Sequence, residues 1–319
     1  MKLGVFTALF GGRRLSDALD YIVESGLEAV EIGTGNYPGN PHCPLGELLS
    51  SKKKRDEWKA KITDRGLEIS ALSCHGNPIH PNKKIAAAHD KVFRDTIRLA
   101  RQLGIEVVVN FSGCPGDKDG AKYPNWVVCP WPPHFTEMVN WQWEKKVIPY
   151  WKAAARLAKN NGIKVGLEMH PGFVVYSPET MMRLRDAVGK NIGANFDPSH
   201  LFWQGIDPIA SLRCLGDAIF HIHAKDCAIY PPVKLTGVLD TKPYAHEIHR
   251  AWIFRTVGYG HGYDFWKDFV STLRLIGYDG AISIEHEDSL MSVNEGFQKA
   301  VAFLKDVLLT EKPGEMWWA

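Results

Sequence analysis

The chain has 319 residues, of which 45% are hydrophobic, and its 38 basic and 36 acidic side chains leave a formal net charge of +2. This near balance provides no overall field that would attract nucleic acid or an anionic membrane. The six cysteines form no CxxC pair, so we expect reduced thiols and no disulfide framework.

No basic segment with a cleavage site precedes the first apolar run, which covers residues 3–9. No uncharged apolar run approaches the roughly 20 residues that cross a bilayer. We therefore expect a cytoplasmic protein without a signal peptide or a membrane span.

Short, continuous, β-rich apolar runs alternate with longer amphipathic runs along the chain. The short runs are typical of strands that are covered on both faces, and they comprise residues 3–9, 29–33, 68–74, 106–111, 164–169, 193–197, 218–223 and 281–286. The clearest helical patterns cover residues 86–103, 141–160, 177–188 and 264–276. Several helical patterns end at a glycine just before the next strand, where a left-handed cap suits glycine: Gly26, Gly66, Gly104, Gly162 and Gly277.

Eight strand–helix units in order predict a parallel sheet, and eight strands close a barrel. A doubly wound open sheet is the alternative, but no glycine-rich dinucleotide fingerprint follows the first strand. We therefore predict one α/β domain over residues 1–319, a single (β/α)8 TIM barrel with long loops after strands 4 and 7.

The two long connections, residues 113–133 and 227–261, are rich in Trp, Tyr and Pro, which favours order. Loops of this length in a compact domain are usually functional or disordered. Both follow strands and would rise from the catalytic face of a barrel. We interpret them as substrate lids, with subunit contact as the alternative.

Polar side chains end seven of the eight predicted strands, at the edge where barrels carry their functional groups. Strands two to four end at Glu31, His75 and Asn110, and strands five to eight end at Glu168, Asp197, His223 and Glu285. Charged groups at the mouth of an apolar barrel are costly unless they are paired or bind metal. Three carboxylates and one imidazole suit Mn²⁺, Mg²⁺ or Co²⁺ better than structural zinc, which favours cysteine. We predict one divalent cation, Mn²⁺ before Mg²⁺ or Co²⁺, on these last four residues.

The pattern resembles the xylose isomerase-like barrel superfamily, with its ketose 3-epimerases, inosose dehydratases and apurinic endonuclease cousins, over nearly the whole chain. The resemblance rests on four motifs: Glu168-Met-His-Pro-Gly172, Asp197-Pro-Ser-His200, His221-Ile-His-Ala-Lys-Asp226 and Gly280-Ala-Ile-Ser-Ile-Glu-His-Glu287. It implies that Glu168, Asp197, His223 and Glu285 are the ligands of a single metal, and that His200 touches a substrate oxygen.

The predicted function is that of a divalent-metal-dependent sugar isomerase or epimerase, which deprotonates the carbon alpha to a carbonyl through a metal-bound enediolate. A cation that holds the carbonyl oxygen stabilises the enediolate, while one carboxylate removes the proton and another returns it. The resemblance implies that Glu168 and Glu285 perform these catalytic steps. The alternative is a lyase or dehydratase of a keto-sugar, keto-inositol or 3-keto-glycoside, which would share the first step. A third class, a metal-binding regulatory or carrier subunit, is disfavoured by the retained glutamate pair.

Further substrate-binding candidates are His75, Asn110, Arg255 and Trp126, for which loop anchoring or packing is the alternative. His170 is expected to point outward, and Lys225 and Asp226 are expected to form an ion pair or to orient His223. The related 3-epimerases carry an arginine where this chain has Ile229, so Arg255 is a candidate replacement.

We expect a carbohydrate substrate as the small-molecule partner, and neither nucleic acid nor membrane. Asn110 stands where the endonuclease cousins have a histidine, and no phosphate cradle follows the seventh or eighth strand. This favours an unphosphorylated sugar. We also expect a homo-oligomer, in which the aromatic tail Met316-Trp-Trp318 is buried at a subunit contact, or else packs on its own barrel.

Overall fold

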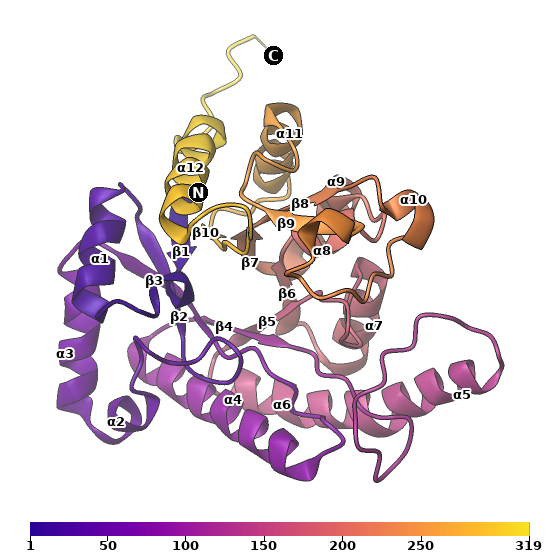
Figure 1. Ribbon diagram of the computed structural model, residues 1–319. Helices are drawn as coiled ribbons and strands as arrows, with labels where there is room; N and C mark the ends of the chain where they lie inside the picture. The colour runs from indigo at the N-terminus through magenta and orange to yellow at the C-terminus, as the bar shows by residue number, and fades with distance from the viewer. Residues whose placement is uncertain (319) are drawn as a thin grey trace.

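Eight parallel strands close into a barrel in this computed structural model, which describes residues 1–318 (Figure 1). Around the barrel the order is β1-β10-β7-β6-β5-β4-β3-β2, so each strand pairs with its neighbour in sequence among the barrel strands. The strands are β1 (Lys2–Phe6), β2 (Ala29–Gly33), β3 (Glu68–Ser73), β4 (Val107–Phe111), β5 (Lys164–Glu168), β6 (Ile192–Phe196), β7 (Ile219–Ala224) and β10 (Ala281–Ile284). The predicted (β/α)8 barrel is confirmed, and the open sheet was the wrong alternative.

Helices cover the outside of the barrel between successive strands (Figure 1). They are α1 (Leu15–Glu24), α2 (Leu45–Ser50), α3 (Lys52–Thr63), α4 (Lys83–Leu103), α6 (Ile148–Asn160), α7 (Pro178–Val188), α9 (Pro208–Leu215), α11 (Tyr263–Leu275) and α12 (Val293–Val307). By contrast, α5 (His134–Trp141) extends away from the barrel, and α8 (Ser199–Phe202) follows β6 at its carboxyl end (Figure 1). In α4 the Asn82 side chain caps the first turn by accepting the Lys84 N–H at 3.0 Å. The helix ends at Gly104, whose φ of 73° is left-handed, and the other four predicted glycine stops also have positive φ.

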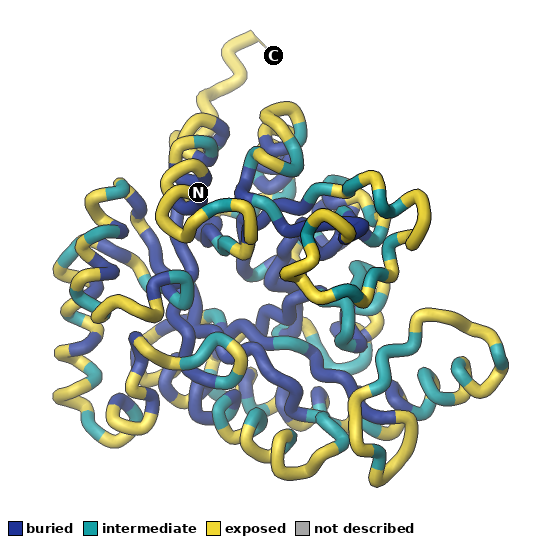
Figure 2. Tube along the Cα trace, viewed as in Figure 1, coloured by how far each residue is buried: buried dark blue, intermediate teal, exposed yellow. Residues whose placement is uncertain are grey.

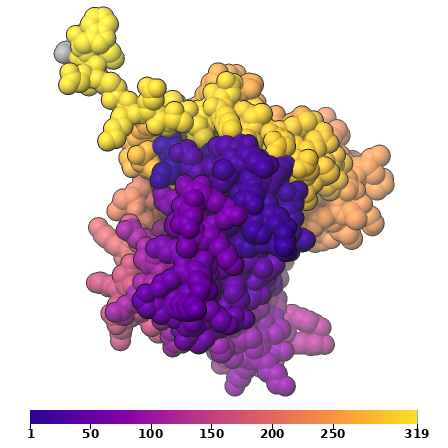
Figure 3. Space-filling model, turned by 90° about the vertical axis from the view of Figure 1, so that its left-hand side faces the viewer, coloured from indigo at the N-terminus to yellow at the C-terminus, as the bar shows by residue number. Residues whose placement is uncertain are grey.

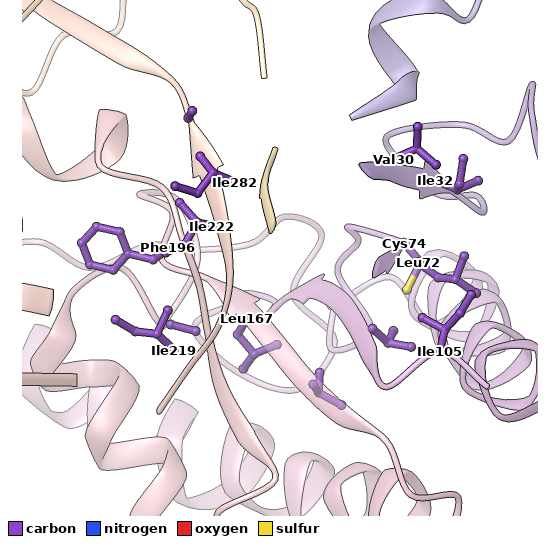
Figure 4. Packing of buried hydrophobic residues seen from close by; sticks show 14 of the residues in the cluster. Val30, Ile32, Leu72, Cys74, Ile105, Leu167, Phe196, Ile219, Ile222 and Ile282 are labelled. Carbon is purple, nitrogen blue, oxygen red and sulfur yellow. The ribbon is translucent and has the colours of Figure 1, made fainter. Parts of the chain in front are cut away.

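Alternation along each strand separates an apolar outer face from a polar interior. In β2, Val30 and Ile32 flank Glu31, and all three are fully buried. Figure 4 shows such aliphatic side chains from several strands in the layer that packs against the helices. Figure 2 shows that the barrel strands are buried while the outer helix faces are exposed. Consequently, Glu31 projects into the barrel. In β4, by contrast, the register places Phe111 beside Glu168 and Asn110 beside Leu167, so Asn110 faces the other way.

Two expected elements have different bounds in the structure. The first strand ends at Phe6, not at residue 9, because residues 7–10 turn into a 3-10 helix, η1 (Thr7–Phe10). The helical pattern at residues 141–160 begins earlier, at α5, and passes through a π-helical turn, η2 (Gln142–Val147), into α6. At the start of this turn, the Gln142 amide donates to the carbonyl oxygens of Gly116 and Asn125, at 3.1 and 2.8 Å, and so anchors the loop at residues 113–133.

The long segment at residues 227–261 contains a small antiparallel sheet, β8 (Asp226–Ile229) with β9 (Trp252–Arg255). Between these strands lie α10 (Val233–Thr236) and η4 (Glu247–His249). Trp252 stacks on Trp203 with ring centroids 4.5 Å apart, which fixes the sheet against the segment after β6. Neither this segment nor residues 113–133 supplies a wall of the central cavity described below, so their role as lids stays a prediction.

The C-terminal tail extends away from the barrel after α12 (Figures 1 and 3). Trp317 and Trp318 are 88% and 68% exposed. The tail therefore does not pack on its own barrel, and its predicted burial at a subunit contact remains a prediction. In the part of the chain that the structure describes, no helix is long and apolar enough to span a membrane.

Gly193 in β6 should not tolerate a side chain. A Cβ there would lie 2.2 Å from the Ala218 carbonyl oxygen and 2.6 Å from the Phe220 ring. We expect Gly193→Ala to lower the free energy of unfolding by about 1–3 kcal/mol, as measured by urea denaturation. Gly12→Ala is the control, because nothing lies within 4 Å of its added Cβ. Equal stabilities of the two variants would contradict this packing.

Candidate metal centre

Glu168, Asp197, His223 and Glu285 meet at the carboxyl-end mouth of the barrel. One ligand atom from each lies within 4.8 Å of the others. His223 Nδ1 lies 3.3 Å from Glu168 Oε2 and 3.0 Å from Glu285 Oε2. Each residue comes from the end of a different strand, β5, β6, β7 or β10, and these four strands are consecutive in the barrel. The structure thus brings together the four side chains that the sequence singled out.

His223 is oriented by a carboxylate from the opposite wall. Its Nε2 donates to Glu31 Oε2 at 2.8 Å, and Glu31 also accepts a hydrogen bond from the Ser73 hydroxyl. This leaves Nδ1 facing Glu168 and Glu285, an arrangement typical of histidines that bind metal. Burial alone would lower the pKa of His223, but Glu31 and Glu285 raise it well above its ordinary value.

Both oxygens of Glu168 accept hydrogen bonds. His75 Nε2 lies 2.9 Å from Oε2, the Asn195 amide donates to the same oxygen at 3.0 Å, and His200 Nε2 lies 3.0 Å from Oε1. Burial would raise the pKa of Glu168, but these histidines and His223 hold it well below its usual range. The carboxylate is therefore ionised despite its burial.

Lys225 neutralises the other side of the cluster. Its side chain is 2% exposed, and Nζ lies 3.0 Å from Asp197 Oδ2, 2.9 Å from Glu285 Oε2 and 3.2 Å from Glu287 Oε2. Burial would raise the pKa of Glu285, yet Lys225 and His223 hold it well below its ordinary value. The ion pairs expected for Lys225 thus exist, but with these carboxylates instead of Asp226.

The hydrogen bonding of Asp197 indicates whether the cluster suits a cation. Its Oδ1 accepts the Ser199 N–H at 2.8 Å, whereas the buried Oδ2 has no well-directed hydrogen bond among the described residues, although Lys225 Nζ lies 3.0 Å and His200 Nε2 3.2 Å away. Desolvation raises the pKa of Asp197 to about 6. A buried oxygen without a donor is rare and requires an explanation. This oxygen and the carboxylate-rich donor set fit a divalent cation of the Mn²⁺ or Mg²⁺ type.

A cavity of about 510 Å³ opens onto the cluster, and both Glu168 and Glu285 line it. Its wall includes Phe111 and Phe173, whose rings stack with centroids 4.3 Å apart. His170 also lines the cavity, which corrects the expectation that it points outward. His170 lies two positions after Glu168, so strand alternation, continued past the end of β5, places both side chains on the same face.

The remaining predicted substrate contacts divide into two groups. His75 and His200 reach the cluster through Glu168. The other three predicted residues make contacts elsewhere. Asn110 Oδ1 accepts the N–H groups of Gly76 and Phe111, and the Trp126 ring packs edge-on against Tyr176.

Arg255 donates to Asp288 at 3.0 Å and to the Tyr230 hydroxyl at 2.6 Å. Asn110, Trp126 and Arg255 thus lie outside the cluster, and their contacts with substrate remain predictions.

The sequence did not single out Asn195, and the role expected for Asp226 differs from the one that the structure shows. Asn195 lies two positions before Asp197 on the same face of β6, so alternation alone could have indicated that it points inward. Asp226 follows β7, and its Oδ2 accepts the N–H groups of Gly258, Gly260 and His261 at 2.9–3.1 Å. This carboxylate ties the end of β7 to the start of α11, and no local signal in the sequence shows that pairing.

The fold and the cluster together define a (β/α)8 barrel that could hold a metal ion at its mouth. Residues 19–307 match the family described as xylose isomerase-like TIM barrel, and the chain belongs to this family. The uncharacterized protein YfiH of Bacillus subtilis (strain 168) is 38% identical over 312 residues, which span 97% of this chain and 99% of YfiH.

Two solved structures share the fold. The IolI protein with a bound zinc atom aligns with a TM-score of 0.64 at 18% identity, over 97% of this chain and 98% of its own. The 3-keto-D-glucoside 4-epimerase YcjR of E. coli aligns with a TM-score of 0.64 at 16% identity, over 96% and 99%.

Added Mn²⁺ should stabilise the wild-type protein against heat, and Asp197→Asn should largely remove this effect. A ligand at 100 times its Kd adds about 2.7 kcal/mol, and the variant loses a negatively charged ligand. Calorimetry with Mn²⁺ or with a chelator measures the difference. Glu287→Gln is the control, because Glu287 contacts Lys225 but lies outside the four-residue cluster. An undiminished metal effect in Asp197→Asn would place the cation elsewhere.

Asp226→Asn should lower the free energy of unfolding by about 1–3 kcal/mol, because an amide would replace a carboxylate that accepts several buried N–H groups. Denaturant unfolding measures this loss. Asp264→Asn, an exposed position at the start of α11, should change stability little. If both variants matched the wild type, Asp226 would not anchor the loop.

Proposed function

We propose that this protein is a sugar isomerase or epimerase that uses one divalent cation, Mn²⁺ by preference, at Glu168, Asp197, His223 and Glu285. It moves a proton on the carbon alpha to a carbonyl by way of an enediolate. The observation that carries the proposal is that Glu168 and Glu285 belong to the same four-residue cluster and line the same cavity.

The two carboxylates provide the proton transfers. A divalent cation at the cluster would polarise the substrate carbonyl and stabilise the charge that develops on its oxygen. The histidines around Glu168 and the ammonium of Lys225 beside Glu285 keep both carboxylates ionised, and therefore able to accept a proton. One carboxylate removes the proton from one face of the substrate, and the other returns a proton to the opposite face or to the neighbouring carbon.

The cavity favours a neutral sugar. None of the described residues that line it is Lys or Arg, whereas Glu168, Glu285 and Glu287 all border it. This negative lining would repel a phosphate group. The aromatic wall of Phe111 and Phe173 suits the apolar face of a sugar ring. The similarity in fold to a 3-keto-D-glucoside 4-epimerase is consistent with a carbonyl-bearing sugar as substrate.

Deuterium incorporation is the decisive test. The Mn²⁺-loaded protein in D₂O, with a panel of ketoses, aldoses and keto-glycosides, should exchange the proton alpha to the carbonyl without other change in mass, as read by NMR and mass spectrometry. Glu168→Gln and Glu285→Gln should each slow exchange by about 100-fold or more, because each removes a proton-transfer group.

Glu106→Gln is the control, because this exposed residue lies at the other end of the barrel, before β4. Loss of water or of an aglycone together with exchange would favour the lyase. Unchanged exchange in Glu285→Gln would exclude the two-carboxylate mechanism.

A further inference from the structure

Glu168 presents its two oxygens to two different groups of ligands. Oε2 lies 3.3 Å from His223 Nδ1, within the four-residue cluster. Oε1 lies 3.0 Å from His200 Nε2, which also lies 3.2 Å from Asp197 Oδ2 of the first cluster. A carboxylate arranged in this way can bridge two cations, one on each oxygen.

The second side carries a ligand set of its own. Glu168, His170 and His200 each offer one ligand atom, and these atoms lie within 4.8 Å of one another. The two imidazole rings lie 4.1 Å apart between centroids. His170 Nδ1 faces the Pro171 carbonyl oxygen at 2.5 Å, which fixes the ring and leaves Nε2 available as the ligand nitrogen. His170 also lines the central cavity, so an ion can reach it from solvent.

We propose that Glu168, His170 and His200 form a second divalent-cation site, selective for zinc, which shares Glu168 with the first. Two imidazoles and one carboxylate are the protein ligands of many open zinc sites, with the fourth position left to water or substrate. The first cluster, with three carboxylates and one imidazole, is harder and suits Mn²⁺ or Mg²⁺. The two sites therefore differ in the metal that they prefer.

If the proposed function is correct, a cation in the second site should inhibit catalysis. When both oxygens of Glu168 bind cations, neither is free to accept a proton. Zinc at this site would therefore inhibit proton transfer by a protein whose first site holds Mn²⁺.

The metal content of the full-length protein tests the site directly. Metal-depleted protein is saturated with Zn²⁺, passed through a desalting column and analysed by inductively coupled plasma mass spectrometry. We expect two zinc ions per chain in the wild type and one in His170→Ala. His286→Ala is the matched control, since this histidine lines the same cavity without belonging to the cluster, and it should keep two. A single zinc ion in the wild type would refute the site, as would two in His170→Ala.

Deuterium exchange with and without zinc tests the consequence. Zinc added to Mn²⁺-loaded protein should slow exchange by about 100-fold or more in the wild type, because it withdraws a proton-transfer group. In His170→Ala, the ratio of the exchange rate without zinc to the exchange rate with zinc should be close to one. An equal slowing in both proteins would show that zinc acts by replacing Mn²⁺ and would overturn the inhibitory role. If the Mn²⁺-loaded wild type shows no exchange even without zinc, while the metal analysis finds two zinc ions, the proposed function is refuted and the second site stands.

Discussion

Buried negative charge at the mouth of the barrel is the constraint on which the rest of the site depends. Glu31, Glu168 and Asp197 are buried there, and the side chain of Glu285 is only 18% exposed. Removing an isolated carboxylate from water costs several kcal/mol, so each of these groups needs a donor or a cation. His223 and Lys225 supply positive charge from β7 and its end, and histidines from the ends of β3 and β6 surround Glu168. The carboxylates still outnumber the positive groups, so a divalent cation would complete the neutralisation.

The segments above the barrel are held by the same kind of interaction. Asp226 binds the backbone before α11, and Asp288 accepts the Thr256 N–H at 2.8 Å and the Arg255 side chain. These two carboxylates connect the segment at residues 227–261 to β7 and to the turn that carries Glu285. Phe254 from this segment packs edge-on against His200, with ring centroids 5.3 Å apart, and Lys225 Nζ lies 4.8 Å from the Phe254 centroid. The order of the segment at residues 227–261 and the position of the four-residue cluster are therefore coupled.

The sequence predicted those features that depend on local patterns. Strand periodicity and glycine stops located all eight barrel strands, and polar residues at strand ends identified the four members of the cluster. Errors arose where a contact distant in sequence decides. The first strand ends at Phe6, and Thr7, in the 3-10 helix that follows, donates to the Glu31 carbonyl oxygen at 3.0 Å. His170 was wrongly expected to point outward, although it lies two positions after Glu168 and alternation places both side chains on the face that lines the cavity.

The sequence by itself determined the (β/α)8 architecture and the set of side chains that end its strands, because alternation, helix periodicity and glycine caps act over a few residues. Only the tertiary structure decided which of those side chains form ion pairs or hydrogen bonds with one another and which line the same cavity. Lys225 pairs with Asp197 and Glu285 instead of its neighbour Asp226, and Arg255 binds Asp288 outside the cavity wall. Such pairings depend on the distances between strand ends once the barrel has closed, and residues far apart in the chain set those distances.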